Sequence, residues 1–136
     1  MEASARYLNG VKFSIECGRH VLVCDQPAEN GGDGAGPSPP DLLLASLAAC
    51  AAYYALRYLQ ARSLPTEGLM VRVTAHKASP PPRLDAFRVE LRLPALDERH
   101  REGVLRAVKS CLIHNTLTEA AEIETVVDTA VTTSAT

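Results

Sequence analysis

The stretch from Gly36 to Arg62, GPSPPDLLLASLAACAAYYALRYLQAR, constrains the fold of this chain more than any other. Its first residues carry the signals that begin a helix. Ser38 is a good N-cap, Pro39 suits the first helical position, and Asp41 completes an acidic variant of the capping box. The Asp41 carboxylate also lies at the positive end of the helix dipole. The sequence therefore predicts a helix that begins at Pro39.

The body of this predicted helix is almost entirely aliphatic. No residue between Leu42 and Leu56 is charged, and a helix that is apolar on all sides is expected to be buried on all sides. A membrane span needs about 20 apolar residues, which this window does not reach before Arg57. We therefore predict a long, buried central helix with a single thiol, Cys50, inside it.

The length and charge of the chain narrow its class. A chain of 136 residues suits one domain, residues 1–136, with a sizeable core. The net charge is −2 and the basic residues form no stripe, so neither nucleic acid nor an anionic membrane surface is an expected partner. The N-terminal residues lack the charged and apolar regions of a signal peptide. We expect a cytoplasmic protein.

Four cysteines, Cys17, Cys24, Cys50 and Cys111, are spread along the chain without a CxxC pair. Their spacing is not that of a structural zinc site, and we expect neither a metal nor another cofactor. A disulfide in the cytoplasm is more often transient and catalytic than structural. Cys17 and Cys24 fit the inward face of a strand pair and are expected in the core. A lone cysteine in an apolar helix is, by itself, more often a small core residue than a nucleophile.

The first part of the chain predicts a three-stranded antiparallel meander, with strands over Ala3–Leu8, Val11–Cys17 and His20–Cys24. Asn9-Gly10 and Gly18-Arg19 are turn signals. A two-residue second turn places Ile15 opposite Leu22, which continues the apolar face of one strand on the next. The following residues, Asp25–Ser38, are rich in Gly, Pro and Asp and predict a loop.

The second part of the chain predicts two more strands, two helices and a closing strand, over Leu69–His76, Ala86–Leu93, Asp97–Cys111, Asn115–Ala121 and Glu122–Val131. The second helix is amphipathic, with Val104, Leu105 and Val108 on one face. The predicted order is β-β-β-α-β-β-α-α-β. Strand runs interrupted by isolated helices favour an α+β fold with a mixed sheet.

Three stretches resemble one known family. GGDGAGPSPPDLLLASLAAC (Gly31–Cys50) is similar to the loop and buried cysteine helix of the OsmC/Ohr superfamily, the osmotically inducible protein C and organic hydroperoxide resistance proteins, in its GPSP-type branch. KSCLIHNTL (Lys109–Leu117) resembles the second cysteine signature of that superfamily. HVLVCDQP (His20–Pro27) resembles the strand that leads into the loop. The resemblance covers nearly the whole chain.

This resemblance implies an OsmC-like fold and an intertwined homodimer with the buried helices at its centre. It implies that Cys50 is the peroxidatic thiol and Cys111 the resolving thiol of a thiol-dependent peroxidase. Members of the superfamily reduce organic hydroperoxides in oxidative-stress defence, with a dihydrolipoyl protein or a small thiol as reductant. We therefore expect an organic hydroperoxide as substrate and a thiol reductant as partner.

A peroxidatic cysteine must be a reachable thiolate with a cation or donor close by. Cys50 lies about three turns into its helix, so the helix dipole contributes little there, and burial raises a thiol pKa. The candidates for a stabilising group are Arg6, Arg19 and His114, the last on the helix face of Cys111 if that segment is helical.

One position favours a different function. Peroxidase members of the superfamily carry a glutamate ten residues before the first cysteine, and this chain has Pro40 there, followed by Asp41. The alternative is an OsmC-fold dimer that binds a small apolar ligand or senses oxidants without efficient turnover.

Overall fold

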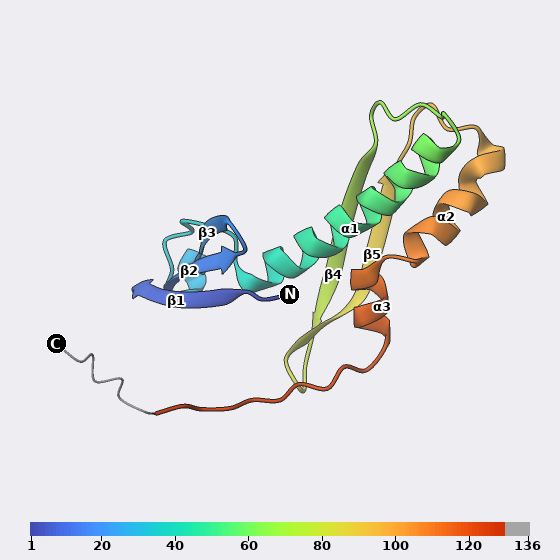
Figure 1. Ribbon diagram of the computed structural model, residues 1–136. Coiled ribbons are helices and arrows are strands. Elements are labelled where there is room, and N and C mark those ends of the chain that lie inside the picture. Colours follow the sequence, from blue (N-terminus) through green and yellow to red (C-terminus); the bar gives the residue numbers. More distant parts are fainter. Residues whose placement is uncertain (130–136) are drawn as a thin grey trace.

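The computed structural model of the protein describes residues 1–129. Figure 1 shows its helices and strands, which follow in this order: β1 (Ser4–Asn9), β2 (Lys12–Cys17), β3 (His20–Cys24), the 3-10 helix η1 (Ala28–Asn30), α1 (Pro39–Ala61), β4 (Met70–Ala78), β5 (Arg83–Arg92), the 3-10 helix η2 (Glu98–His100), α2 (Arg101–Lys109) and α3 (Leu112–Thr118). The predicted α+β class is confirmed, and so is the element order as far as α3.

The first three strands form the predicted antiparallel meander. Ile15 pairs with Leu22 and Phe13 pairs with Cys24, as a two-residue turn at Gly18 and Arg19 requires. The first turn lies one residue later than predicted, at Gly10 and Val11, with a register shift in β1 before it.

The two cysteines of the meander differ in burial. Cys24, at the end of β3, is buried, as predicted. Cys17 was predicted in the core but is exposed. It lies at the last position of β2, where its register partner His20 is also exposed. The alternation of apolar and polar residues along β2 predicts which face of the sheet Cys17 is on. It does not show that this end of the face is exposed to solvent.

The central helix α1 begins as predicted. Ser38 is its N-cap and accepts a hydrogen bond from the backbone N–H of Asp41, while the Asp41 carboxylate accepts the backbone N–H of Ser38 at 2.9 Å. Pro39 and Pro40 occupy the first helical turn, where a missing N–H leaves no helical bond unmade. The local sequence therefore fixes where α1 begins, and with it the position of Cys50.

Within one chain α1 is buried on one face only. The buried residues recur at helical spacing: Leu47, Ala51, Ala55 and Leu59. The opposite face is open, and Tyr53 is 57% exposed. The expectation of burial on all sides is therefore not met by the chain itself. The helix is long and apolar enough to cross a membrane by length and composition, a test that the core helix of a soluble protein also passes.

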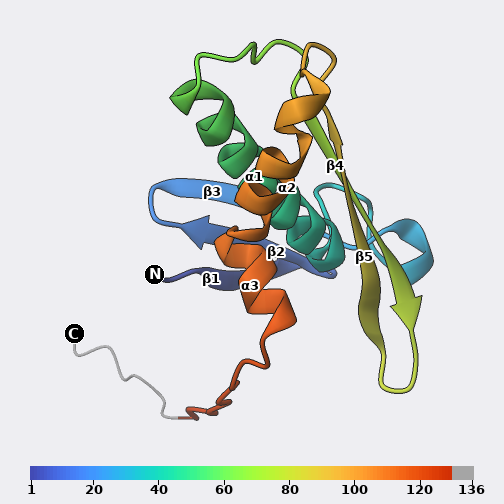
Figure 2. The same cartoon turned by 90° about the vertical axis from the view of Figure 1, so that its right-hand side faces the viewer.

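The buried face of α1 packs on α2 and on the β4–β5 hairpin. Ala51 and Ala55 of α1 form one cluster with Val104 and Val108 of α2. Alanine at the contact lets the two helix axes approach closely. Apolar residues of the hairpin pack against this cluster, among them Val71, Val89, Leu91 and Leu93. Figures 1 and 2 show α1 and α2 on the same side of the hairpin.

A second contact holds α2 in place near the C-terminal end of α1. The Tyr58 hydroxyl is 3.1 Å from Nδ1 of His100, just before α2. Gly103 in α2 lies directly against the Tyr58 ring, since a Cβ at Gly103 would be 2.2 Å from the Tyr58 hydroxyl oxygen. Any side chain at this position would displace the Tyr58 ring from its contact with α2. The position of α2 in turn sets the position of Cys111, which follows it.

The sheets differ from the predicted single mixed sheet. Within residues 1–129 the strands form two antiparallel sheets, β1-β2-β3 and β4-β5. The strand predicted at Glu122–Val131 is not formed in the described residues: residues 120–129 have no regular secondary structure, and the last two predicted residues lie outside them. A strand needs a neighbour to accept its backbone hydrogen bonds. Figure 2 shows this segment running from α3 away from β5, and Ile123 is 88% exposed.

Candidate active site

The structure brings Cys50 and Cys111 together. Cys50 lies in the middle of α1, and Cys111 lies between α2 and α3. The two thiols lie close enough together for Cys50 to raise the pKa of Cys111, and neither sulfur is in a disulfide. Cys111 is completely buried, whereas Cys50 is partly exposed. Two cysteines that are 61 positions apart in sequence thus form a thiol pair in the reduced protein.

Cys111 owes its position to a break between two helices. Helix α2 ends at Lys109, Ser110 is its C-cap, and Cys111 takes up an extended conformation as the N-cap of α3. Its sulfur accepts a hydrogen bond from the backbone N–H of His114 over 3.4 Å. The predicted long helix over Asp97–Cys111 is therefore shorter, and its last residue belongs to the next helix as a cap.

The surroundings of Cys111 favour its protonated form. Burial raises the pKa of the Cys111 thiol, and the neighbouring Cys50 thiol raises it further. The backbone N–H groups of His114 and Ile113 oppose this by stabilising the thiolate. The net result is a pKa above the ordinary thiol value. Cys111 is therefore a neutral thiol at neutral pH.

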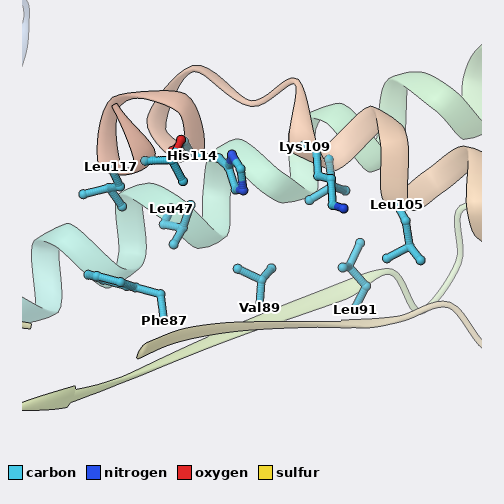
Figure 3. Close-up of a pocket in the computed structure, with 10 residues that line it drawn as sticks. Leu47, Phe87, Val89, Leu91, Leu105, Lys109, His114 and Leu117 are labelled. Carbon is cyan, nitrogen blue, oxygen red and sulfur yellow. The ribbon is translucent and has the colours of Figure 1, made fainter. Parts of the chain in front are cut away.

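A largely apolar pocket of about 430 Å³ lies between β5 and the helices. Its lining residues are Leu47, Phe87, Val89, Leu91, Leu105, Val108, Lys109, His114, Leu117 and Thr118. Figure 3 shows the β5 side chains pointing toward α1, α2 and α3 across this space. Leu47 lies one turn before Cys50 on α1, and His114 follows Cys111 by three residues. Neither cysteine lines the pocket itself, but residues within one helical turn of each do.

The polar groups of the pocket come from the segment around Cys111. They are Lys109, His114 and Thr118. His114 was predicted near the thiols, and the structure places it in the pocket wall, with Nδ1 3.4 Å from Oδ1 of Asn115. Lys109 was not predicted. Helical spacing could have indicated it, because Lys109 lies four residues after Leu105 and so shares the same face of the helix.

The two arginine candidates lie elsewhere in the chain. Arg6 is on β1 and Arg19 is in the turn between β2 and β3. Figure 1 shows this sheet beyond the N-terminal end of α1, whereas Cys50 is in the middle of that helix. Within one chain, the backbone N–H of His114 bonds to the Cys111 sulfur, whereas both arginines lie with the sheet.

Peroxidase members of the superfamily have a glutamate at the position of Pro40, and the neighbouring Asp41 does not take its place. Its carboxylate accepts hydrogen bonds from the backbone N–H and the hydroxyl of Ser38, at 2.9 and 2.6 Å. These bonds, first the one from the hydroxyl, lower the pKa of Asp41. The carboxylate is thus committed to the helix cap, about two turns from Cys50. Among residues 1–129, no group of three His, Cys, Asp or Glu side chains could hold a metal ion.

The family model of the OsmC-like protein matches residues 31–126. This range covers well over half of the chain, and the protein belongs to the OsmC-like family. No curated protein matches it in sequence.

Solved structures share the fold. An OsmC-like protein from Mycoplasma pneumoniae superposes with a TM-score of 0.72 at 22% identity, over 86% of each chain. An organic hydroperoxide resistance protein from Elizabethkingia anophelis gives a TM-score of 0.62 at 18% identity, over 83% of this chain and 84% of that one. An organic hydroperoxide resistance protein from Legionella pneumophila gives a TM-score of 0.59 at 19% identity, over 85% of this chain and 87% of that one. At these identities the likeness establishes the fold.

Proposed function

We propose that this protein is a thiol-dependent peroxidase that reduces organic hydroperoxides and serves in oxidative-stress defence. The observation that carries the proposal is the proximity of Cys50 and Cys111, together with an apolar pocket lined by residues within one turn of each. Membership of the OsmC-like family, and structural neighbours that are named for organic hydroperoxide resistance, support the same function. The apolar lining favours an organic hydroperoxide over hydrogen peroxide.

The reaction needs two thiols in contact. The Cys50 thiolate attacks the outer oxygen of the hydroperoxide, an S–O bond forms, the O–O bond breaks, and the alkoxide takes a proton to leave as the alcohol. The Cys111 sulfur then attacks the Cys50 sulfenic acid, so that a disulfide forms and water leaves with the Cys111 proton. An external thiol reductant, a dihydrolipoyl protein or a small thiol, returns both cysteines to thiols and is itself oxidised to a disulfide.

The unequal environments of the two thiols assign their roles. The attacking sulfur must meet the substrate, and Cys50 is the more exposed of the pair. Cys111 is buried and its pKa is raised, which suits a thiol that waits for the sulfenic acid on its neighbour. We assign Cys50 as the peroxidatic cysteine and Cys111 as the resolving cysteine.

A single chain supplies two side chains of the pocket wall that could stabilise the thiolate, Lys109 and His114, and we propose His114. It lies in the pocket wall and follows Cys111 by three residues. Its imidazolium form would stabilise the thiolate, and the same group could protonate the departing alkoxide. Arg6 or Arg19 would have to come from a second copy. A homodimer in the cytoplasm, built on the open face of α1, is the assembly that we propose.

The test is consumption of cumene hydroperoxide with dihydrolipoamide as reductant. We expect turnover by the wild type and loss of at least a hundredfold in Cys50→Ser. Cys111→Ser should react once and then stop, because the sulfenic acid has no partner. Cys17→Ser is the matched control, since Cys17 is an exposed thiol that does not line the pocket of its own chain, and it should keep wild-type activity. Equal rates in the wild type and Cys50→Ser would refute the proposal.

A binding or sensing role is the second candidate. Pro40 in place of the glutamate and the engagement of Asp41 with Ser38 favour it. In that case the pocket would bind an apolar fluorescent probe, and peroxide would oxidise the thiols once, while steady turnover with dihydrolipoamide would be absent. The same assay therefore separates the two functions.

A further inference from the structure

We propose that the Cys111 sulfur has a second role as the cap of α3, and that disulfide formation with Cys50 releases this cap and loosens the pocket wall. The proposal rests on the proposed function, because it needs the Cys50–Cys111 disulfide. It adds a coupling between the oxidation state of the thiols and the shape of the pocket beside them.

The cap is visible in the reduced protein. An N-cap side chain normally offers an oxygen to the backbone N–H two or three positions further on. Here the acceptor is the Cys111 sulfur and the donor is the N–H of His114, at 3.4 Å. The N–H of Ile113 also helps to stabilise the Cys111 thiolate. The thiol therefore satisfies one of the N–H groups that a helix start leaves without partners.

Helix α3 depends strongly on this cap. It has seven residues, and isolated helices shorter than about 12 residues are marginal in water. None of its residues is buried, and Leu112 and Leu117 are exposed. At its other end the chain leaves at Glu119 in an extended conformation. With little packing to hold the helix, the loss of its cap should have a visible effect.

Oxidation removes the cap through the chemistry of sulfur. The resolving step joins the Cys111 sulfur covalently to the Cys50 sulfur on α1. Forming this bond draws the sulfur to covalent distance from the Cys50 sulfur, away from the backbone N–H of His114. A sulfur that was a weak acceptor as a thiol is thereby moved from the position that capping requires.

The wall that loosens is part of the active site. Helix α3 contributes His114, Leu117 and Thr118 to the pocket. The disulfide would form at Cys111, which is completely buried in the reduced protein. A loosened α3 lets the alcohol product leave and gives the external reductant access to the disulfide. Rereduction restores the cap and closes the pocket for the next hydroperoxide.

Hydrogen exchange of the full-length protein tests this coupling. Backbone amides of residues 112–118 are followed in the reduced protein and after one equivalent of cumene hydroperoxide, with the disulfide verified by mass. We expect exchange there to rise about fivefold on oxidation, the effect of losing an ordinary N-cap. The meander of β1, β2 and β3 should be unchanged.

Three variants separate the cap from the disulfide. Cys111→Ser keeps a capping oxygen and forms no disulfide, so its exchange should be slow with or without peroxide. Cys111→Ala should exchange rapidly even when reduced. Cys50→Ser keeps the capping sulfur and should not respond to peroxide.

Two results would overturn the coupling alone: a wild-type disulfide without faster exchange at residues 112–118, or equal exchange in reduced Cys111→Ala and Cys111→Ser. If peroxide forms no Cys50–Cys111 disulfide at all, the proposed function fails together with the coupling.

Discussion

The carboxylate of Asp25 accepts a hydrogen bond from the backbone N–H of Ala35 over 2.9 Å, ten residues further along the chain. The same side chain also accepts the N–H groups of Gln26 and Asp33, at 2.8 and 3.1 Å. It is 1% exposed. These bonds join the end of β3 to the loop that leads into α1, so one buried carboxylate fixes the approach to the helix that carries Cys50.

Asp25→Asn should therefore destabilise the protein by several degrees in Tm. The variant has one acceptor oxygen for three N–H donors, and its amide nitrogen faces donors instead of accepting from them. Asp33→Asn is the control in the same loop, because the Asp33 side chain is exposed and pairs only with Lys12 there. Thermal denaturation followed by circular dichroism measures both. An equal loss in both variants would show that burial of Asp25 does not matter.

The same carboxylate predicts a pH dependence. The N–H of Ala35, followed by those of Gln26 and Asp33, holds the pKa of Asp25 below its ordinary value of 3.8. A carboxylate with a lowered folded pKa stabilises the protein fully above the unfolded pKa, and this contribution is lost as the pH falls through the folded pKa. Below pH 3.8 the wild type should therefore lose stability more steeply than Asp25→Asn. Parallel pH profiles would contradict this.

Gly36→Ala should be disruptive because the backbone of β3 passes very close to it. A Cβ at Gly36 would be 1.9 Å from the carbonyl oxygen of Val23, and backbone cannot move aside as a side chain can. Gly10→Ala is the control: its φ is +54°, but a Cβ there meets open space. Left-handed backbone costs alanine about 1–2 kcal/mol, and we expect Gly36→Ala to lose more in urea denaturation. A smaller loss would show that the loop can shift.

Ser38→Ala tests the cap of α1. The Ser38 hydroxyl accepts the N–H of Asp41, and its loss should cost about 1 kcal/mol in urea denaturation. Ser38→Asn keeps a capping oxygen and should retain most of the stability. If the alanine and asparagine variants were equally stable, the capping bond would contribute nothing.

The features that the sequence predicted best are governed by neighbours in the chain. The cap of α1 depends on Ser38 and Asp41, which are three residues apart, and the pairing of Ile15 with Leu22 follows from one two-residue turn. Such signals can be read without knowing the rest of the fold. The exposure of Cys17 could not be predicted in this way, because the alternation of apolar and polar residues does not show which end of a strand is exposed to solvent.

The candidate site also combines features that follow from neighbours in the chain with features that depend on the rest of the fold. Cys50 and Cys111 were paired through resemblance to a family, and neither helical spacing nor composition relates two residues so far apart in sequence. The role of the Cys111 sulfur as a cap was missed because the sequence favoured one continuous helix up to it. The predicted strand at Glu122–Val131 failed for a related reason: β propensity describes a segment, whereas a strand also requires an edge to pair with.

The open face of α1 supports a final prediction, that the protein is a homodimer in solution. Tyr53 lies on this face, 57% exposed and one turn from the partly exposed Cys50. Burying a large aromatic side chain at an interface centre stabilises association strongly. Tyr53→Glu would place a charge there, and we expect the dimer to dissociate at concentrations where the wild type stays associated, as measured by light scattering after size exclusion.

Ala95→Glu is the matched control, because it introduces the same single negative charge at an exposed residue between β5 and η2. It should leave the wild-type mass unchanged. If peroxidase turnover needs an arginine from the second copy, Tyr53→Glu should also lower turnover in proportion to the monomer fraction, and raising the protein concentration should restore it. A monomeric wild type would contradict the prediction, since the apolar face of α1 would then have to be stable in water without a partner.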